Sequence, residues 1–197
     1  RALALEPRDA SGLESLASAL RAKALKTTAK EDWDELAKTL ARRLALPASV
    51  GGKRAALARE LASIHSDHRE DAEEAARVWE RALGERSAPE DADSDGRLSA
   101  EELVVALAED LAVAREAGSF FEKSERWPGL AIALGRVSEV APEPERPEAL
   151  RRLAEVLATK LNDRSAAARA LERLSELKPQ AIPALESLAQ LYRETRD

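Results

Sequence analysis

The chain has no cysteine and no methionine among its 197 residues, and only 3% of its residues are aromatic. Without cysteine, disulfides, thiolate catalysis and cysteine-type zinc sites are excluded. No apolar run approaches the roughly 18 residues that a membrane-spanning helix needs, so we expect a chain that does not span a membrane. Because the sequence begins at Arg1 and lacks methionine, we interpret it as a fragment of a longer protein whose localisation it does not reveal.

Glycine and proline are also scarce, at 8 and 9 residues, whereas alanine and leucine supply over a third of the chain. This composition favours helices and offers almost nothing suited to strands, so it predicts an all-α fold. The formal net charge is −6. Most of the acidic excess lies within residues 85–102, which argues against nucleic acid as the main partner.

Apolar residues recur at helical spacing along most of the chain, which predicts eight or nine helices. Five of them are expected over about 11–20, 31–46, 53–66, 71–83 and 100–117, and further helices start near residues 125, 148 and 163. Pro7 and Pro47 end helices in this interpretation, and Gly51-Gly52 forms a loop.

The same residues return along the chain at nearly fixed shifts. The matched pairs include Trp33 with Trp127 at a shift of 94, and Leu61 with Leu153 and Trp79 with Leu171 at a shift of 92. Residues 177–189 repeat residues 5–17 at a shift of 172. Such self-similarity is typical of a stacked helical array, so we expect the members of each pair to be structurally equivalent and mostly buried.

Two segments, residues 148–157 and 163–179, resemble a tetratricopeptide repeat (TPR). Leucines and Ala154 occupy the packing positions of its first helix, and Ala167, Leu171 and Pro179 occupy those of its second. The resemblance implies a right-handed α-α superhelix, a solenoid of antiparallel helix pairs. It also implies a concave face that binds a protein or peptide partner.

A twelve-residue acidic stretch separates the two repeated parts of the chain and has the ligand pattern of a calcium loop. Its candidate oxygen donors are Asp91, Asp93, Asp95, Arg97 through its carbonyl, Ser99 and Glu102. Hard cations need six to eight oxygens, which a short loop supplies from alternate residues. With Gly96 at the sharp turn and Leu98 as an apolar anchor, the stretch resembles an EF-hand loop and predicts bound Ca²⁺.

The alternative interpretation of this stretch is an acidic linker with an Asp-Gly turn. No second loop is present to pair with the first, so we expect an affinity of roughly 10⁻⁴–10⁻³ M, weaker than that of calcium sensors.

Three other patterns suggest sites only weakly. His65 and His68 are three apart and could present two imidazoles to one metal, but a solvated helix end is the default interpretation. Residues 51–54 could meet an anion at a helix start, yet they lack a preceding strand. Phe120-Phe121 falls between predicted helices, where it could be an exposed anchor. No constellation for catalysis stands out, so we expect a protein that is not an enzyme.

These patterns predict one TPR-like domain over residues 1–197, with halves 1–84 and 103–197 joined by the acidic loop 85–102. The favoured function is a non-catalytic protein-interaction scaffold with a structural calcium site. Alternatives are a calcium-responsive regulatory module and the helical-repeat part of a larger enzyme. The sequence leaves the partner and the oligomeric state open.

Overall fold

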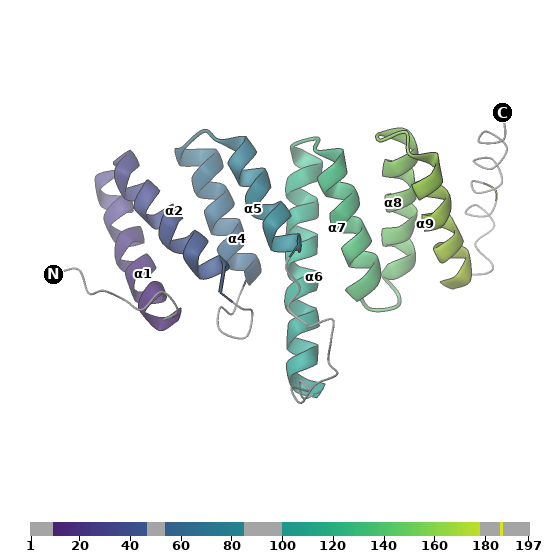
Figure 1. The fold of residues 1–197 in the computed structure, drawn as a ribbon, viewed down its shortest axis with the longest axis horizontal. Helices are drawn as coiled ribbons and strands as arrows, with labels where there is room; N and C mark the ends of the chain where they lie inside the picture. Colours follow the sequence, from purple (N-terminus) through teal and green to yellow (C-terminus); the bar gives the residue numbers. More distant parts are fainter. Residues whose placement is uncertain (1–9, 47–53, 85–99, 178–185, 187–197) are drawn as a thin grey trace. The chain divides into compact units, whose positions relative to one another are not determined.

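A computed structural model describes residues 10–46, 54–84, 100–177 and 186, with side chains in the first turn of the helix from Ala100 left out. Within these residues the chain forms eight α-helices and one π-helix, and no strand (Figure 1). The predicted all-α fold is therefore confirmed for the described part of the chain.

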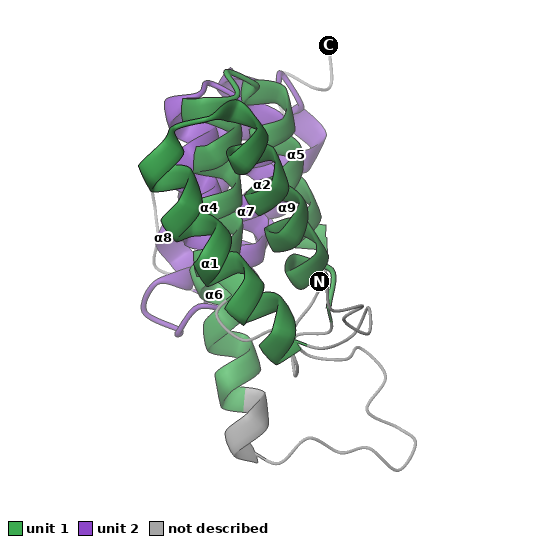
Figure 2. Cartoon of the chain, turned by 90° about the vertical axis from the view of Figure 1, so that its left-hand side faces the viewer, with its two compact units in different colours: residues 1–113 green, residues 114–197 purple. Residues whose placement is uncertain are grey.

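The chain divides into two compact units, residues 1–113 and 114–197 (Figure 2). The first contains α1 (Ala10–Thr27), α2 (Lys30–Leu44), α4 (Arg54–Ser63), the π-helix η1 (Ile64–His68) and α5 (Ala72–Gly84). α6 (Ala100–Lys123) crosses the boundary, and α7 (Trp127–Val140), α8 (Arg146–Thr159) and α9 (Arg164–Leu177) complete the second unit. No described helix is both long enough and apolar enough to cross a membrane.

Within each unit, helices pack on their neighbours in the chain. α1 contacts α2, α2 contacts α4 and α4 contacts α5, while α7 contacts α8 and α8 contacts α9. Leucines fill the spaces between them, with Leu36 and Leu61 at 0% and 1% exposed in the first unit and Leu150 at 1% in the second. Such burial stabilises each contact by about 1.5–3 kcal/mol per leucine.

A short turn joins the two helices of each pair, and each turn contains one non-glycine residue with positive φ. These residues are Thr28, Glu70, Glu125 and Asn162, with φ between 52° and 55°. The left-handed conformation ends the first helix and lets the chain reverse direction at once. Four helix pairs therefore share one turn design: α1/α2, α4–η1/α5, α6/α7 and α8/α9.

The shift of 92 predicted from the sequence is confirmed in the last pair of each half. The five buried residues of α5 are Ala75, Ala76, Val78, Trp79 and Ala82, and those of α9 are Ala167, Ala168, Ala170, Leu171 and Leu174. Each member of the second set lies 92 positions after its counterpart. The turns agree as well, because the carboxylates of Asp71 and Asp163 accept hydrogen bonds from the amides of Glu74 and Ala166, both at 2.9 Å.

The first pair of each half follows a different shift from the predicted 94. Thr28 and Glu125, the turn residues, are 97 apart. The same shift carries the buried Ala17 and Ala24 of α1 onto the buried Ala114 and Phe121 of α6. The change from 97 to 92 follows because α8 begins sooner after α7 than α4 begins after α2.

The predicted equivalence of Trp33 and Trp127 is therefore wrong by three residues. Trp33 is the fourth residue of α2, whereas Trp127 is the first residue of α7 and only partly buried. The residues that contact the two rings nevertheless stand at equivalent positions. Trp33 stacks on His68 with ring centroids 3.7 Å apart, and the Nζ of Lys160, 92 positions after His68, lies 4.6 Å from the Trp127 ring centroid.

Two predicted helix ends also differ from the structure. α6 continues through Gly118 to Lys123 instead of ending near Ala117, because Phe121 is fully buried and its packing outweighs the low helix propensity of one glycine. The third predicted helix ends as a π-helix at His68.

The predicted pair Leu61 and Leu153 differs in burial. Leu153 is only partly buried, whereas Leu61 at the equivalent position is buried.

Candidate functional site

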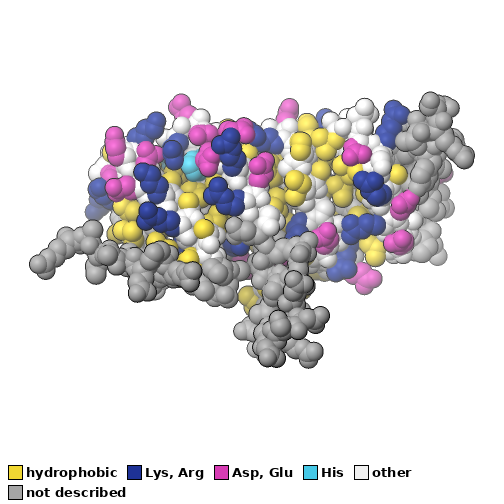
Figure 3. Space-filling model, in the orientation of Figure 1, with side chains coloured by type: hydrophobic (Ala, Val, Ile, Leu, Met, Phe, Trp, Pro, Cys, Tyr) yellow, Lys and Arg dark blue, Asp and Glu magenta, His cyan; other side chains and the backbone are white. Residues whose placement is uncertain are grey.

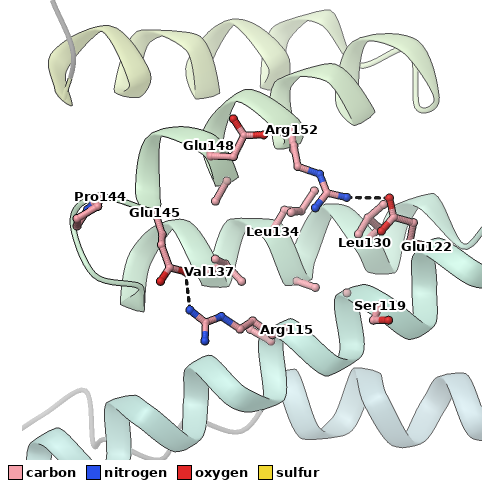
Figure 4. Close-up of a pocket in the computed structure, with 14 residues that line it drawn as sticks. Arg115, Ser119, Glu122, Leu130, Leu134, Val137, Pro144, Glu145, Glu148 and Arg152 are labelled. Carbon is pink, nitrogen blue, oxygen red and sulfur yellow. Dashed lines mark hydrogen bonds and ion pairs between the residues drawn. The ribbon is translucent and has the colours of Figure 1, made fainter.

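A hollow of about 420 Å³ lies in the second unit between the C-terminal part of α6, α7 and α8 (Figure 4). We call it the α6–α8 hollow. α6 contributes Ala114, Arg115, Gly118, Ser119 and Glu122; α7 contributes Leu130, Ala133, Leu134 and Val137; and α8 with the preceding turn contributes Pro144, Glu145, Glu148, Ala149 and Arg152. Its volume falls within the range of about 300–1,000 Å³ common for ligand pockets.

Small residues create this space on both of its walls. Gly118 faces α7, because a Cβ placed on it would lie 3.6 Å from the Cβ of Ala133 and 3.8 Å from Cδ1 of Leu130. α8 presents Ala149, which is 5% exposed. With so little side-chain volume on α6 and α8, a hollow remains over the aliphatic residues of α7, of which Leu130, Ala133 and Leu134 are at most 7% exposed.

Two ion pairs cross the hollow from α6 to the α8 side, one at each end. Arg115 lies 2.5 Å from Glu145, and Arg152 lies 2.7 Å from Glu122. Figure 4 shows the apolar side chains of α7 between the two pairs. On each side the charged residues are seven positions apart, so the pairs are separated by about 10 Å, two helical turns.

These rim charges are about half exposed, with side-chain accessibilities from 41% to 52%. Ion pairs of this kind contribute only about 0–1 kcal/mol each, so an incoming group can replace one at small cost. A third carboxylate of the lining, Glu148, pairs with Arg151 at 2.7 Å. That guanidinium keeps the pKa of Glu148 below its usual value.

The equivalent groove of the first half is crossed by a different ion pair. The position of Gly118 is occupied there by Arg21, whose guanidinium makes two hydrogen bonds of 2.6 and 2.7 Å to the carboxylate of Glu60. Glu60 in turn stands where the second half has Arg152. Leu57 replaces Ala149, so α4 also contributes more volume than α8 does.

The paired phenylalanines, expected between helices and considered as an exposed anchor, lie inside α6 instead. Phe121 is 0% exposed, and its ring packs on the backbone of Gly129, where an added Cβ would lie only 2.6 Å from a ring carbon. In the first half, Ala24 stands at the position of Phe121 and the buried Asp32 at that of Gly129. At these two positions the larger side chain is therefore on the second helix of the pair in the first half and on the first helix in the second half.

Asp32 is buried because it has charged and polar partners nearby. The Nζ of Lys23 lies 2.6 Å from one carboxylate oxygen, and the hydroxyl of Thr27 donates a hydrogen bond to the other. The ammonium group first, and the hydroxyl second, lower the pKa of Asp32.

The two histidines, for which a solvated helix end is the default interpretation and a metal pair the alternative, lie in different surroundings. His68 stacks on Trp33, while the side chain of His65 is buried at 6% exposed. The solvated helix end is therefore wrong for His65. Among the residues that the structure describes, no group of three or more histidine and acidic side chains could hold a metal ion.

Burial also affects the titration of His65. Its Nδ1 is enclosed and has no hydrogen-bond partner among the described residues. Burial, and secondly the neighbouring Arg69, lower the pKa of this imidazole below its usual 6.5. The π-turn around it is closed by a hydrogen bond of 2.8 Å from the amide of Asp71 to the carbonyl of His65.

The predicted calcium ligands Asp91, Asp93, Asp95, Arg97 and Ser99 lie outside the described residues. Glu102 lies in the first turn of α6, but its side chain is not among those described. Calcium binding by this loop stays a prediction. The possible anion site also falls mostly outside, and its one described member, Arg54, is buried at 6% exposed.

The residues of the α6–α8 hollow were not predicted from the sequence as a site. A signal was present in the repeat, because aligning the halves at their turns sets Gly118 against Arg21 and Arg152 against Glu60. The predicted shift of 94 sets Gly118 against Ala24 and so hides the difference from Arg21, whereas the predicted shift of 92 already sets Arg152 against Glu60.

No protein-family model matches the chain, and neither a curated protein nor a solved structure is similar enough to count as a match.

Proposed function

We propose that this chain is a non-catalytic protein-interaction scaffold that binds a peptide segment of its partner in the α6–α8 hollow. The observation that carries the proposal is an apolar hollow between two helices at the place where the first half has the Arg21–Glu60 ion pair. Anchors buried in such hollows supply most of the affinity of a typical interface.

The chain as a whole is proposed to be a TPR-like right-handed solenoid. In support, four helix pairs share one turn design and two of them share all five buried positions of their second helix. α6 and α8 are the first helices of adjacent pairs, so the hollow would lie on the concave face. Figure 3 shows basic and acidic side chains interspersed over the visible face, which suits a protein partner better than nucleic acid.

Selection from a random peptide library tests this function. The immobilised chain should enrich peptides that bind it and do not bind an Ala149→Leu variant, whose added side chain occupies the hollow. An Ile132→Ala variant provides the matched control, because Ile132 is 59% exposed on α7 and does not line the hollow. Peptides that bind all three proteins equally would refute the hollow as the binding site.

A second candidate function, a calcium-responsive module, is favoured by one observation. The predicted loop runs directly into α6, and this continuous helix also carries Arg115, Gly118 and Glu122 of the hollow. Calcium at Glu102 would then influence a helix that binds the partner. A metal that binds only the folded chain adds about 2.7 kcal/mol of stability at a hundred times its dissociation constant.

Thermal unfolding of metal-stripped chain shows whether calcium binds, and peptide affinity with and without calcium then separates the two candidates. Millimolar calcium should raise the midpoint, and Asp91→Ala or Glu102→Gln should abolish the rise while leaving the helices folded. A structural site leaves peptide affinity unchanged once the chain is folded, whereas a regulatory site changes it. If calcium gives neither heat on titration nor a thermal shift, the loop is only an acidic linker.

A further inference from the structure

The π-helix η1 lies between α4 and α5 in the chain and also contacts α2, so one short segment meets three helices of the first unit. Towards α2, the ring centroids of His68 and Trp33 lie 3.7 Å apart. Towards α5, the amide of Asp71 donates a hydrogen bond of 2.8 Å to the carbonyl of His65. Opening of this segment, which we call the η1 turn (residues 65–71), would break both contacts.

The buried histidine of the η1 turn fits its site better as a neutral group than as a cation. His65 is 6% exposed, and its Nδ1 is enclosed without a hydrogen-bond partner among the described residues. An imidazolium carries an N–H on both ring nitrogens, so in the charged form Nδ1 would be a buried donor without an acceptor. Burial of an unpaired charge is unfavourable. Protonation therefore favours a conformation in which the ring reaches water.

The charged groups that act on His65 come from α2, from α5 and from the η1 turn itself. Burial first, and Arg69 second, lower the pKa of this imidazole, whereas Glu74, Asp71 and Asp34 raise it. Two of these carboxylates already have partners. Asp34 lies 3.2 Å from the guanidinium of Arg69, and Asp71 accepts a hydrogen bond of 2.9 Å from the amide of Glu74. The balance of these groups with burial keeps the pKa below its usual value, so the closed turn favours the neutral ring.

The second half has the same backbone turn without a titratable group inside it. The amide of Asp163 donates a hydrogen bond of 2.8 Å to the carbonyl of Leu157, and these residues lie 92 positions after Asp71 and His65. Leu157 packs against the core of the second unit. The backbone hydrogen bond therefore forms with an aliphatic residue at this position, so the buried imidazole is a feature that the first half adds to a shared turn.

We infer that the η1 turn is a pH-sensitive switch, which is closed while His65 is neutral and opens locally when the imidazole is protonated. Opening moves the ring into water, breaks the hydrogen bond from the Asp71 amide and separates His68 from Trp33. The rest of the first unit stays folded, because most of its buried side chains lie outside this turn. The switch is independent of the proposed peptide site, whose lining belongs to the second unit.

Amide hydrogen exchange of the full chain, followed by NMR from pH 7 to pH 5, tests the switch. The protection factor of the Asp71 amide, which is the ratio of intrinsic to observed exchange rate, should fall roughly five- to twentyfold, as expected if His65 regains its ordinary pKa in the open turn. The Asp163 amide makes the same hydrogen bond to a leucine and should keep its protection factor. The amide of Leu40, a fully buried residue of α2, should be better protected than that of Asp71 at every pH, because the turn opens without unfolding the unit.

Two variants assign the effect to the imidazole, and either one suffices if the other is poorly folded. His65→Leu copies the second half, and His65→Gln keeps a polar side chain that does not titrate. The Asp71 amide should lose its pH dependence in both and retain it in His68→Leu. A dependence that persists without His65, or an Asp71 amide that changes no more than that of Asp163, would overturn the inference. Equal protection of Asp71 and Leu40 would overturn it too, because the turn would then open only when the whole unit unfolds.

Discussion

The two halves of the chain use the same helix pairs but treat the groove between first helices in opposite ways. In the first half Arg21 spans from α1 to Glu60 of α4. In the second half Gly118 leaves about 420 Å³ open between α6 and α8. Packing within a pair tolerates little change because a buried interface must stay filled, whereas this outer groove is free to diverge. The difference between the two grooves is the reason why we propose the α6–α8 hollow as the binding site.

The histidine at the end of α4 is a second point of divergence. His65 is buried in a π-turn of the first half, and the equivalent residue in the second half is Leu157, which packs against the core formed by Leu150 and Leu171. The same position therefore holds a titratable side chain in one half and an aliphatic one in the other. π-turns within helices are frequent at functional sites.

The largest effect is expected from truncating the leucines at equivalent positions 61 and 153. Leu61→Ala should lower the free energy of unfolding by about 2–5 kcal/mol, because the side chain is fully buried. Leu153→Ala should cost clearly less, because Leu153 is only partly buried. Urea unfolding of both variants makes the comparison, and equal losses would contradict the difference in burial.

The second largest effect concerns the exchanged contact of Phe121 with Gly129. Gly129→Ala should destabilise the chain by about 1–3 kcal/mol, because the new Cβ would overlap the buried ring. The control is Gly135→Ala on the same helix, where nothing lies within 4 Å of an added Cβ. That variant should stabilise the chain by about 0.5–1 kcal/mol through helix propensity. A stabilising Gly129→Ala would mean that the ring does not pack on this glycine.

Much of the fold could be predicted because periodicity reports burial directly. Trp79 and Leu171 were paired by their shift of 92 alone, and both are buried at that register. The end of α6 was missed because Gly118 is a weak helix former and its compensation, the burial of Phe121, comes from residues distant in sequence. The hollow was missed for a related reason: it consists of absent volume, which a sequence shows only when the two halves are aligned through their turns.

A smaller effect should appear in the pH dependence of stability. The unfolded chain binds a proton on His65 near pH 6.5, whereas the folded chain binds it only at lower pH. The contribution of His65 to stability is therefore complete above about pH 6.5 and is lost as the pH falls toward the folded pKa. Arg69 adds to the lowering of the pKa, while Glu74, Asp71 and Asp34 oppose it.

The second half supplies the substitution that tests this pH dependence. His65→Leu copies Leu157 and should remove the His65 contribution, so its advantage over the unmodified chain should grow from pH 7 to pH 5. Thermal unfolding across this range measures the change, and His68→Leu is the control for loss of an imidazole that stacks on Trp33. A constant advantage at every pH would show that only the volume of residue 65 matters.

The smallest effect is expected at the turns, where the halves differ in how well the residue suits positive φ. Thr28 has φ of 52° and Asn162 has φ of 53°. Asparagine adopts the left-handed region readily, but the branched Cβ of threonine is crowded there. The Thr28 side chain is exposed and its hydroxyl donates only to the carbonyl of Thr27, so little is lost when it is replaced.

Thr28→Asn should therefore raise the free energy of unfolding by about 0.5–1 kcal/mol, and Asn162→Thr should lower it by a similar amount. Urea unfolding of the two single variants and their combination provides the measurement. Because the turns lie in different helix pairs, the two effects should add, leaving the combined variant close to the unmodified chain. Opposite signs for the two substitutions are the essential result, since a turn that merely tolerated any residue would leave both variants unchanged.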